Sequence, residues 1–65
     1  MEAPMETKQA FESGGSRYYV VQKDDRIVVQ RRSWAGRYAL GEVENLEEAF
    51  GLIRQDSGSR RVQPK

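Results

Sequence analysis

Two short runs of β-branched and aromatic residues, separated by only two polar residues, constrain the fold of this chain more than any other feature. The runs are residues 17–23 (RYYVVQK) and 26–32 (RIVVQRR), and Asp24 and Asp25 lie between them. Val, Ile and Tyr favour extended backbone, and a two-residue polar break suits a tight hairpin. The pattern therefore predicts two adjacent antiparallel strands.

A third strand and a helix follow this hairpin. Residues 37–40 (RYAL) begin directly after Gly36 and continue the strand pattern. Asn45 is a good N-cap, and Glu48 three residues later completes an approximate capping box. An apolar stripe at helical spacing comprises Leu46, Ala49, Phe50 and Ile53. These features predict one helix that ends near Gly58 and packs on one face of the sheet.

The two ends of the chain lack such patterns. Residues 1–16 end in SGGS, a composition typical of connectors, and predict a flexible or weakly helical N-terminal arm. Residues 58–65 predict a flexible basic tail. The predicted fold is therefore α+β, with the domain over residues 17–57: a three-stranded antiparallel sheet with one C-terminal helix packed on one face.

The composition excludes several classes of protein. The chain has 65 residues and lacks cysteine and histidine, so it offers neither a disulfide framework nor the usual metal ligands and general base. No apolar run approaches the roughly 20 residues that cross a bilayer, and the acidic N-terminus lacks the features of a signal peptide. We therefore expect a cytoplasmic protein that is not an enzyme and binds no cofactor, metal or membrane.

Charge is segregated along the chain, although the formal net charge is only +1. Residues 17–40 hold six basic and two acidic side chains, whereas residues 41–56 hold one basic and five acidic side chains. The basic residues thus belong to the predicted strands, and the acidic ones to the predicted helix and its approach. This segregation makes the molecule electrically polar.

Strand alternation divides the predicted sheet into two faces. The face that receives the helix comprises Tyr18, Val20, Ile27, Val29, Tyr38 and Leu40, with Gln22 and Arg31 at its ends. The open face comprises Tyr19, Val21, Lys23, Val28, Gln30, Arg32, Arg37 and Ala39. The open face has no acidic residue on the predicted strands. Three strands span about 10 Å, which is comparable with a DNA major groove of about 12 Å.

Residues 37–49 (RYALGEVENLEEA) resemble the third strand and the helix start of the DNA-binding domain of plant ethylene-response factors. Residues 26–32 are similar to the second strand of that domain, and the N-terminal arm-binding domains of phage integrases look like the same unit. The resemblance covers about residues 18–54 and implies that the sheet binds the major groove. The DNA contacts that it implies are Lys23, Gln30, Arg32 and Arg37. The chain departs from the family at several positions: Gln30 lies where the family has a glutamate, Ala39 replaces a DNA-stacking tryptophan, and Glu42 replaces a threonine.

The basic open face leads to a hypothesis of DNA binding. Arginine can bind guanine or phosphate through two nitrogens, glutamine can pair with adenine, and tyrosine can stack on bases. A basic tail can contact phosphates. The predicted nucleic-acid-binding residues are Tyr19, Lys23, Gln30, Arg32, Arg37, Arg60 and Arg61. The predicted function is a small non-catalytic module that binds double-stranded DNA, such as an accessory protein of a phage or mobile element.

The same face also permits a protein partner. Aromatic and apolar side chains anchor many interfaces, and an open strand edge can pair with a partner sheet or with a second copy. The predicted anchors are Tyr19, Val21, Val28 and Trp34. The alternative function is a protein-interaction module, or a small phage-type inhibitor of host machinery, that binds through the sheet face or an open edge. Arginines favour nucleic acid and valines favour protein, so both hypotheses stay open.

Overall fold

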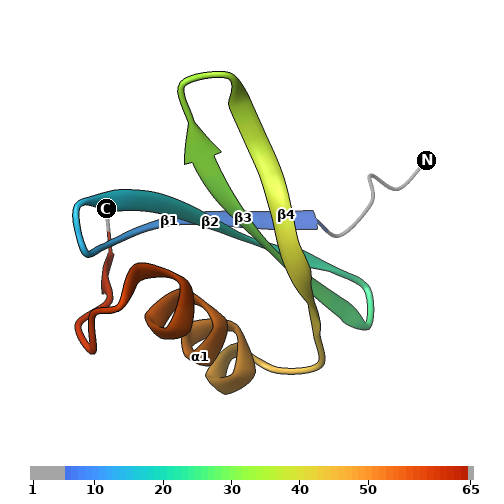
Figure 1. The fold of residues 1–65 in the computed structure, drawn as a ribbon. Helices are drawn as coiled ribbons and strands as arrows, with labels where there is room; N and C mark the ends of the chain where they lie inside the picture. Colours follow the sequence, from blue (N-terminus) through green and yellow to red (C-terminus); the bar gives the residue numbers. More distant parts are fainter. Residues whose placement is uncertain (1–5, 65) are drawn as a thin grey trace.

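One antiparallel sheet, covered on one face by a helix, is formed by residues 6–64, the part of the chain that the computed structural model describes (Figure 1). The elements in chain order are β1 (Glu6–Ser13), β2 (Ser16–Lys23), β3 (Arg26–Ser33), β4 (Gly36–Val43), α1 (Leu46–Ser57) and β5 (Gln63–Pro64). The strand order is β4-β3-β2-β1-β5, with antiparallel neighbours throughout. The β3–β4 hairpin extends past α1 (Figure 1).

The prediction of a three-stranded sheet preceded by a flexible arm is wrong, because residues 6–13 form β1. All eight residues of β1 pair with β2. Gly14 and Gly15 make the connecting turn, with φ angles of 59° and 81° that suit a type I′ hairpin turn. The glycine pair therefore joins two strands tightly, although its composition alone suggests a linker. Residues 1–5 of the predicted arm lie outside the described residues.

The prediction of a flexible tail after the helix is also wrong, because β5 adds a fifth strand beside β1. The hydroxyl of Ser13, which is almost completely buried, donates to the carbonyl of Arg61 at 2.6 Å and lies 2.9 Å from the hydroxyl of Ser57. Val62 packs against the core. A buried hydroxyl requires partners, and Ser13 finds them in the last residue of α1 and in the segment that follows α1.

The predicted helix is confirmed as α1. The side-chain oxygen of Asn45 accepts a hydrogen bond from the Glu48 backbone N–H at 2.9 Å, and the Asn45 amide donates to the Glu48 carboxylate at 3.2 Å. At the other end, Gly58 has a φ of 73°, and its N–H donates to the Arg54 carbonyl at 2.9 Å. These two caps set the helix boundaries, and the overall class remains α+β.

The hydrophobic core lies between α1 and the face that strand alternation assigns to the helix. Its fully buried side chains include Tyr18, Val20, Val29 and Ile53. Phe11 of β1 packs edge-on against Phe50 of α1, with ring centroids 5.2 Å apart. Tyr38, predicted on the same face, is 48% exposed. It lies on the hairpin that extends past α1, so the helix does not cover it.

A bulge in β4 changes the open face. Gln30 is opposite Ala39, but Val29 is opposite Gly41, which leaves Leu40 as an extra residue. Beyond the bulge, β4 continues to Val43, farther than the predicted strand. Glu42 therefore joins the open face opposite Val28. The prediction that the strands of this face carry no acid is wrong for that reason.

Candidate functional site

The sheet face opposite α1 gathers cationic side chains from four strands. They are Lys8 on β1, Arg17 and Lys23 on β2, Arg26 and Arg32 on β3, and Arg37 on β4. Along each strand, these cationic residues alternate with residues that point to the core. Their side chains therefore lie on one surface. We call this surface, with Tyr19 and Gln30 at its centre, the basic face.

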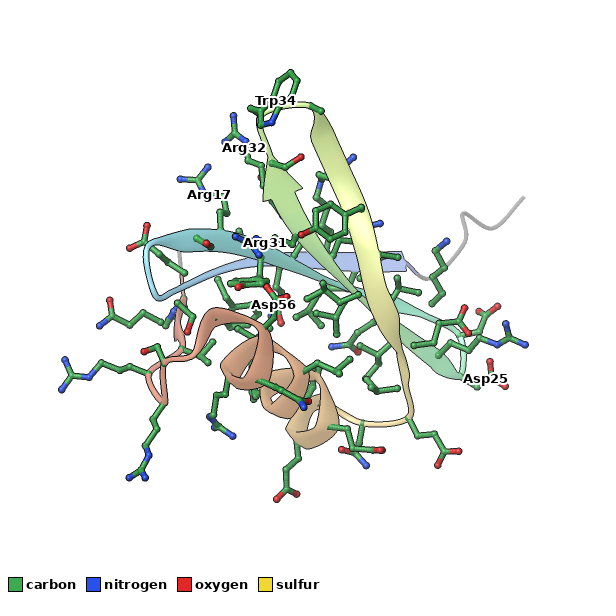
Figure 2. The ribbon with its side chains drawn as sticks, viewed as in Figure 1. Arg17, Asp25, Arg31, Arg32, Trp34 and Asp56 are labelled. Carbon is green, nitrogen blue, oxygen red and sulfur yellow. The ribbon has the colours of Figure 1, made fainter. Side chains whose placement is uncertain are left out.

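Three arginines form a row across β2, β3 and β4. Arg32 is directly opposite Arg37, and Arg17 continues the row because its neighbour Tyr18 is opposite Arg31. Figure 2 shows Arg17 and Arg32 on the same side of the sheet, away from α1. Like charges directly opposite each other destabilise a sheet by roughly 0.2–1 kcal/mol per pair. An anion bound along the row would relieve this repulsion.

Tyr19 lies half-buried beside the row and contacts two cations. The Nζ atom of Lys8 is 4.8 Å from the Tyr19 ring centroid, and the Cζ atom of Arg37 is 5.3 Å from it. Desolvation raises the pKa of the Tyr19 phenol, but a hydrogen bond with Arg17 and the charges of Arg32, Arg17 and Lys8 bring that pKa below its ordinary value of 10.0. The net direction indicates a positive potential over the centre of the basic face.

Gln30 lies on β3 between Tyr19 on β2 and Ala39 on β4. Its Oε1 atom is buried and has no hydrogen-bond partner within residues 6–64. An unpaired buried acceptor costs roughly 1–3 kcal/mol. Arg37 extends from β4 across β3 to the ring of Tyr19, the residue opposite Gln30 on β2.

The positive charge is uneven across the basic face. Arg26 forms a salt bridge with Glu42 at 3.6 Å, and Lys23 is opposite Arg26, at the other end of β2 from the arginine row. Glu12 is opposite Arg17 at the β1 end of the row. The strongest concentration of cations is therefore at Arg32 and Arg37, on the β3–β4 hairpin.

The structure separates several predicted site residues from this centre. Arg60 and Arg61 lie between α1 and β5, at the edge of the sheet farthest from β4. Trp34 is fully exposed at the tip of the β3–β4 hairpin (Figure 2). Val21 is only 5% exposed and Val28 is half-buried, so neither offers much apolar surface to a partner.

Three residues of the basic face, Lys8, Arg17 and Arg26, were absent from the predicted site. Lys8 lies in β1, whose sequence (ETKQAFES) has only Phe11 as a large apolar residue and so carries little strand signal. Arg17 and Arg26 were within reach of sequence reasoning, since strand alternation puts Arg17 on the same face as Tyr19 and Arg26 on the same face as Val28.

On the other face of the sheet, a network of hydrogen bonds attaches α1 to the strands. The Oδ2 atom of Asp56 accepts hydrogen bonds from the Tyr18 hydroxyl at 2.7 Å and from Arg31 at 3.1 Å, and Arg31 also donates to Ser16 at 3.3 Å. Burial raises the pKa of Tyr18, with a further increase from the hydrogen bond to Asp56 and its negative charge. Figure 2 shows Arg31 and Asp56 between the sheet and α1. Arg31 is therefore not part of the basic face.

These pKa directions predict opposite titrations for the two tyrosines. In the folded protein, Tyr19 is expected to ionise below pH 10.0 and Tyr18 above it. Because folding raises the pKa of Tyr18, its contribution to stability is complete below its unfolded pKa of about 10 and is lost as the pH rises through the folded value. NMR of carbon-13-labelled tyrosine from about pH 8 to about pH 12 measures both, with Tyr19→Phe assigning the lower titration. A Tyr19 midpoint at or above that of free tyrosine would contradict the positive potential.

Comparison with known proteins does not identify a family. No family model, curated protein or solved structure matches this chain. The resemblance to ethylene-response-factor and integrase domains therefore stays a prediction. Within residues 6–64, no helix is both long and apolar enough to cross a bilayer.

Proposed function

We propose that this protein is a small, non-catalytic, cytoplasmic module that binds double-stranded DNA through its basic face. The row of Arg17, Arg32 and Arg37 beside Tyr19 is the observation that supports this most. Arginine binds phosphate and guanine through two parallel hydrogen bonds, and an open sheet presents three of them together. The acidic first turn of α1, Glu47 and Glu48, lies behind the sheet, where it would not meet a duplex on the basic face.

The width of the sheet limits how a duplex can bind. Neighbouring strands lie about 4.8 Å apart, so β1 to β4 span about 14 Å, more than the roughly 12 Å of a major groove. A two-stranded ribbon fits that groove. The β3–β4 hairpin extends past α1 and carries Arg32 and Arg37, so it is the part that we place in the groove (Figure 1). Lys8 and Arg17 on the neighbouring strands would then contact phosphates at the rim.

A protein partner is the second candidate, and the exposed Trp34 favours it. Tryptophan is frequent among the residues that dominate binding energy in protein interfaces. β4 is also an open edge of the sheet, to which a partner strand or a second copy can be added. Against this, Val21 and Val28 are largely covered, so the apolar area of the face is small. The cationic surface therefore favours nucleic acid.

Titration of the nitrogen-15-labelled protein with a mixed-sequence DNA duplex tests the proposal. Binding at low salt should shift the backbone resonances of Lys8, Arg17, Tyr19, Gln30, Arg32 and Arg37. With three to five phosphate contacts, log affinity should fall against log salt with a slope of roughly −3 to −4.5 up to about 200 mM. Absence of shifts at low salt would refute DNA binding and favour the protein partner. Shifts centred on Trp34 and the β4 edge, without salt dependence, would also contradict it.

A further inference from the structure

Gln30 is the polar residue of the basic face whose hydrogen-bonding capacity the folded chain leaves unused. Its Oε1 is buried without a partner in the described part of the chain, although Tyr19, the residue opposite it on β2, has Lys8 and Arg37 at its ring. A folded sheet gains nothing from such an atom, since an apolar side chain of similar size would avoid the cost. Features that oppose stability in this way often mark a functional position.

The unpaired Oε1 atom of Gln30 determines which chemical group of a ligand could bind it. Oε1 accepts a hydrogen bond, so its partner must supply an N–H or O–H donor, whereas the surrounding cations require negative charge. Phosphate supplies the charge, but at neutral pH its oxygens are mainly acceptors. A ligand that carries both an amino group and nearby phosphates meets both requirements. Adenine in DNA is such a ligand. Its N6 amino group donates and its N7 accepts, which matches a glutamine amide.

We propose that Gln30 recognises adenine in the major groove, an inference that rests on the proposed DNA-binding function. Oε1 would accept from N6, and Nε2 would donate to N7. Gln30 lies on the β3–β4 hairpin, and the neighbour opposite it on β4 is the small, exposed Ala39. A base edge therefore has room to approach from the β4 side.

Arg37 couples this recognition to phosphate binding. Its guanidinium lies 5.3 Å from the ring centroid of Tyr19, the residue opposite Gln30 on β2. A phosphate that attracts Arg37 away from Tyr19 would clear the surface beside Gln30 as a base edge approaches. Phosphate binding by Arg37 would thus favour the approach of adenine to Gln30.

The test begins with selection from a pool of duplexes that have a randomised central segment. Wild-type protein is expected to enrich adenine at one position or more, and Gln30→Met is expected to lose that enrichment while still binding duplex. Replacing the enriched adenine by 7-deazaadenine removes N7 and should weaken the wild type about tenfold, but leave Gln30→Met unchanged. Gln55→Met makes the same chemical change on α1 and should behave as wild type.

Thermal unfolding provides a second readout that DNA does not affect. Because Gln30→Met removes an unpaired buried acceptor, its Tm should rise on the order of 5 °C, while that of Gln55→Met should change little. A fall in Tm, or the same adenine enrichment in wild type and Gln30→Met, would overturn the inference about Gln30. If the wild type binds no duplex at low salt, both the DNA-binding function and the inference fail. Binding without any base preference overturns the inference alone.

Discussion

The substitution Arg32→Glu is expected to lower the affinity for duplex DNA on the order of a hundredfold at low salt without loss of stability. Arg32 is the central member of the arginine row, between Arg17 and Arg37. The change removes one contact to base or phosphate and places a negative charge where the duplex would lie. Arg32→Ala and Arg37→Ala remove contacts without adding repulsion, so each should reduce affinity about tenfold.

The thermal stability of Arg32→Glu should increase, although its affinity for DNA falls. Glutamate at position 32 converts its two like-charge pairs, with Arg17 and with Arg37, into opposite-charge pairs. Each pair contributes roughly 0.2–1 kcal/mol relative to a neutral pair. Fluorescence anisotropy with a labelled duplex measures the affinity, and thermal unfolding measures the stability.

The matched control for charge is Arg54→Glu, the same substitution on α1 behind the sheet. It alters the net charge equally, so a comparable loss of affinity in both variants would show that net charge, and not the arginine row, governs binding. Unfolding of Arg32→Glu would mean that Arg32 does not lie on an open face.

The substitution Gly14→Ala is expected to destabilise the domain by about 2–5 kcal/mol, against a total stability of about 3–10 kcal/mol for a chain of this length. Gly14 has a φ of 59°, which costs a residue with a Cβ atom roughly 1–2 kcal/mol. A Cβ at this position would also lie 2.9 Å from the carbonyl oxygen of Ser57 at the end of α1. Either the β1–β2 turn or the end of α1 would have to move.

Gly15→Ala separates these two effects. Gly15 has a φ of 81°, but a Cβ there meets no atom within 4 Å. This variant should therefore lose only the backbone term of about 1–2 kcal/mol. Chemical denaturation of both variants measures the difference. Equal losses would contradict the close packing of the β1–β2 turn against α1, on which the five-stranded fold depends.

The sequence contained enough local information to predict the centre of the fold. The β2–β3 hairpin follows from two β-branched runs around a two-residue break, and α1 follows from Asn45, Glu48 and an apolar stripe. Strand alternation placed Tyr18, Val20 and Val29 in the core, as observed. The same alternation placed Gln30, Arg32 and Arg37 together on the open face, so the centre of the candidate site was also predictable.

The outer strands carried too little local signal. β1 has one large apolar residue, Phe11, and β5 has only two residues, one of them a proline. Their pairing depends on contacts between distant residues: Phe11 with Phe50, and Ser13 with Ser57 and Arg61. No window of neighbouring residues contains both members of these pairs.

The sequence by itself determined the elements whose stabilising contacts lie within a few residues: the central hairpin, the capped helix and the alternation that separates core from cations. Only the tertiary structure decided that β1 and β5 complete the sheet, that the β4 bulge brings Glu42 to the open face, and that Lys8 and Arg37 meet at Tyr19. The physical reason is that weak strands form where a neighbouring strand and a helix supply hydrogen bonds and burial, and those partners are far away in the chain.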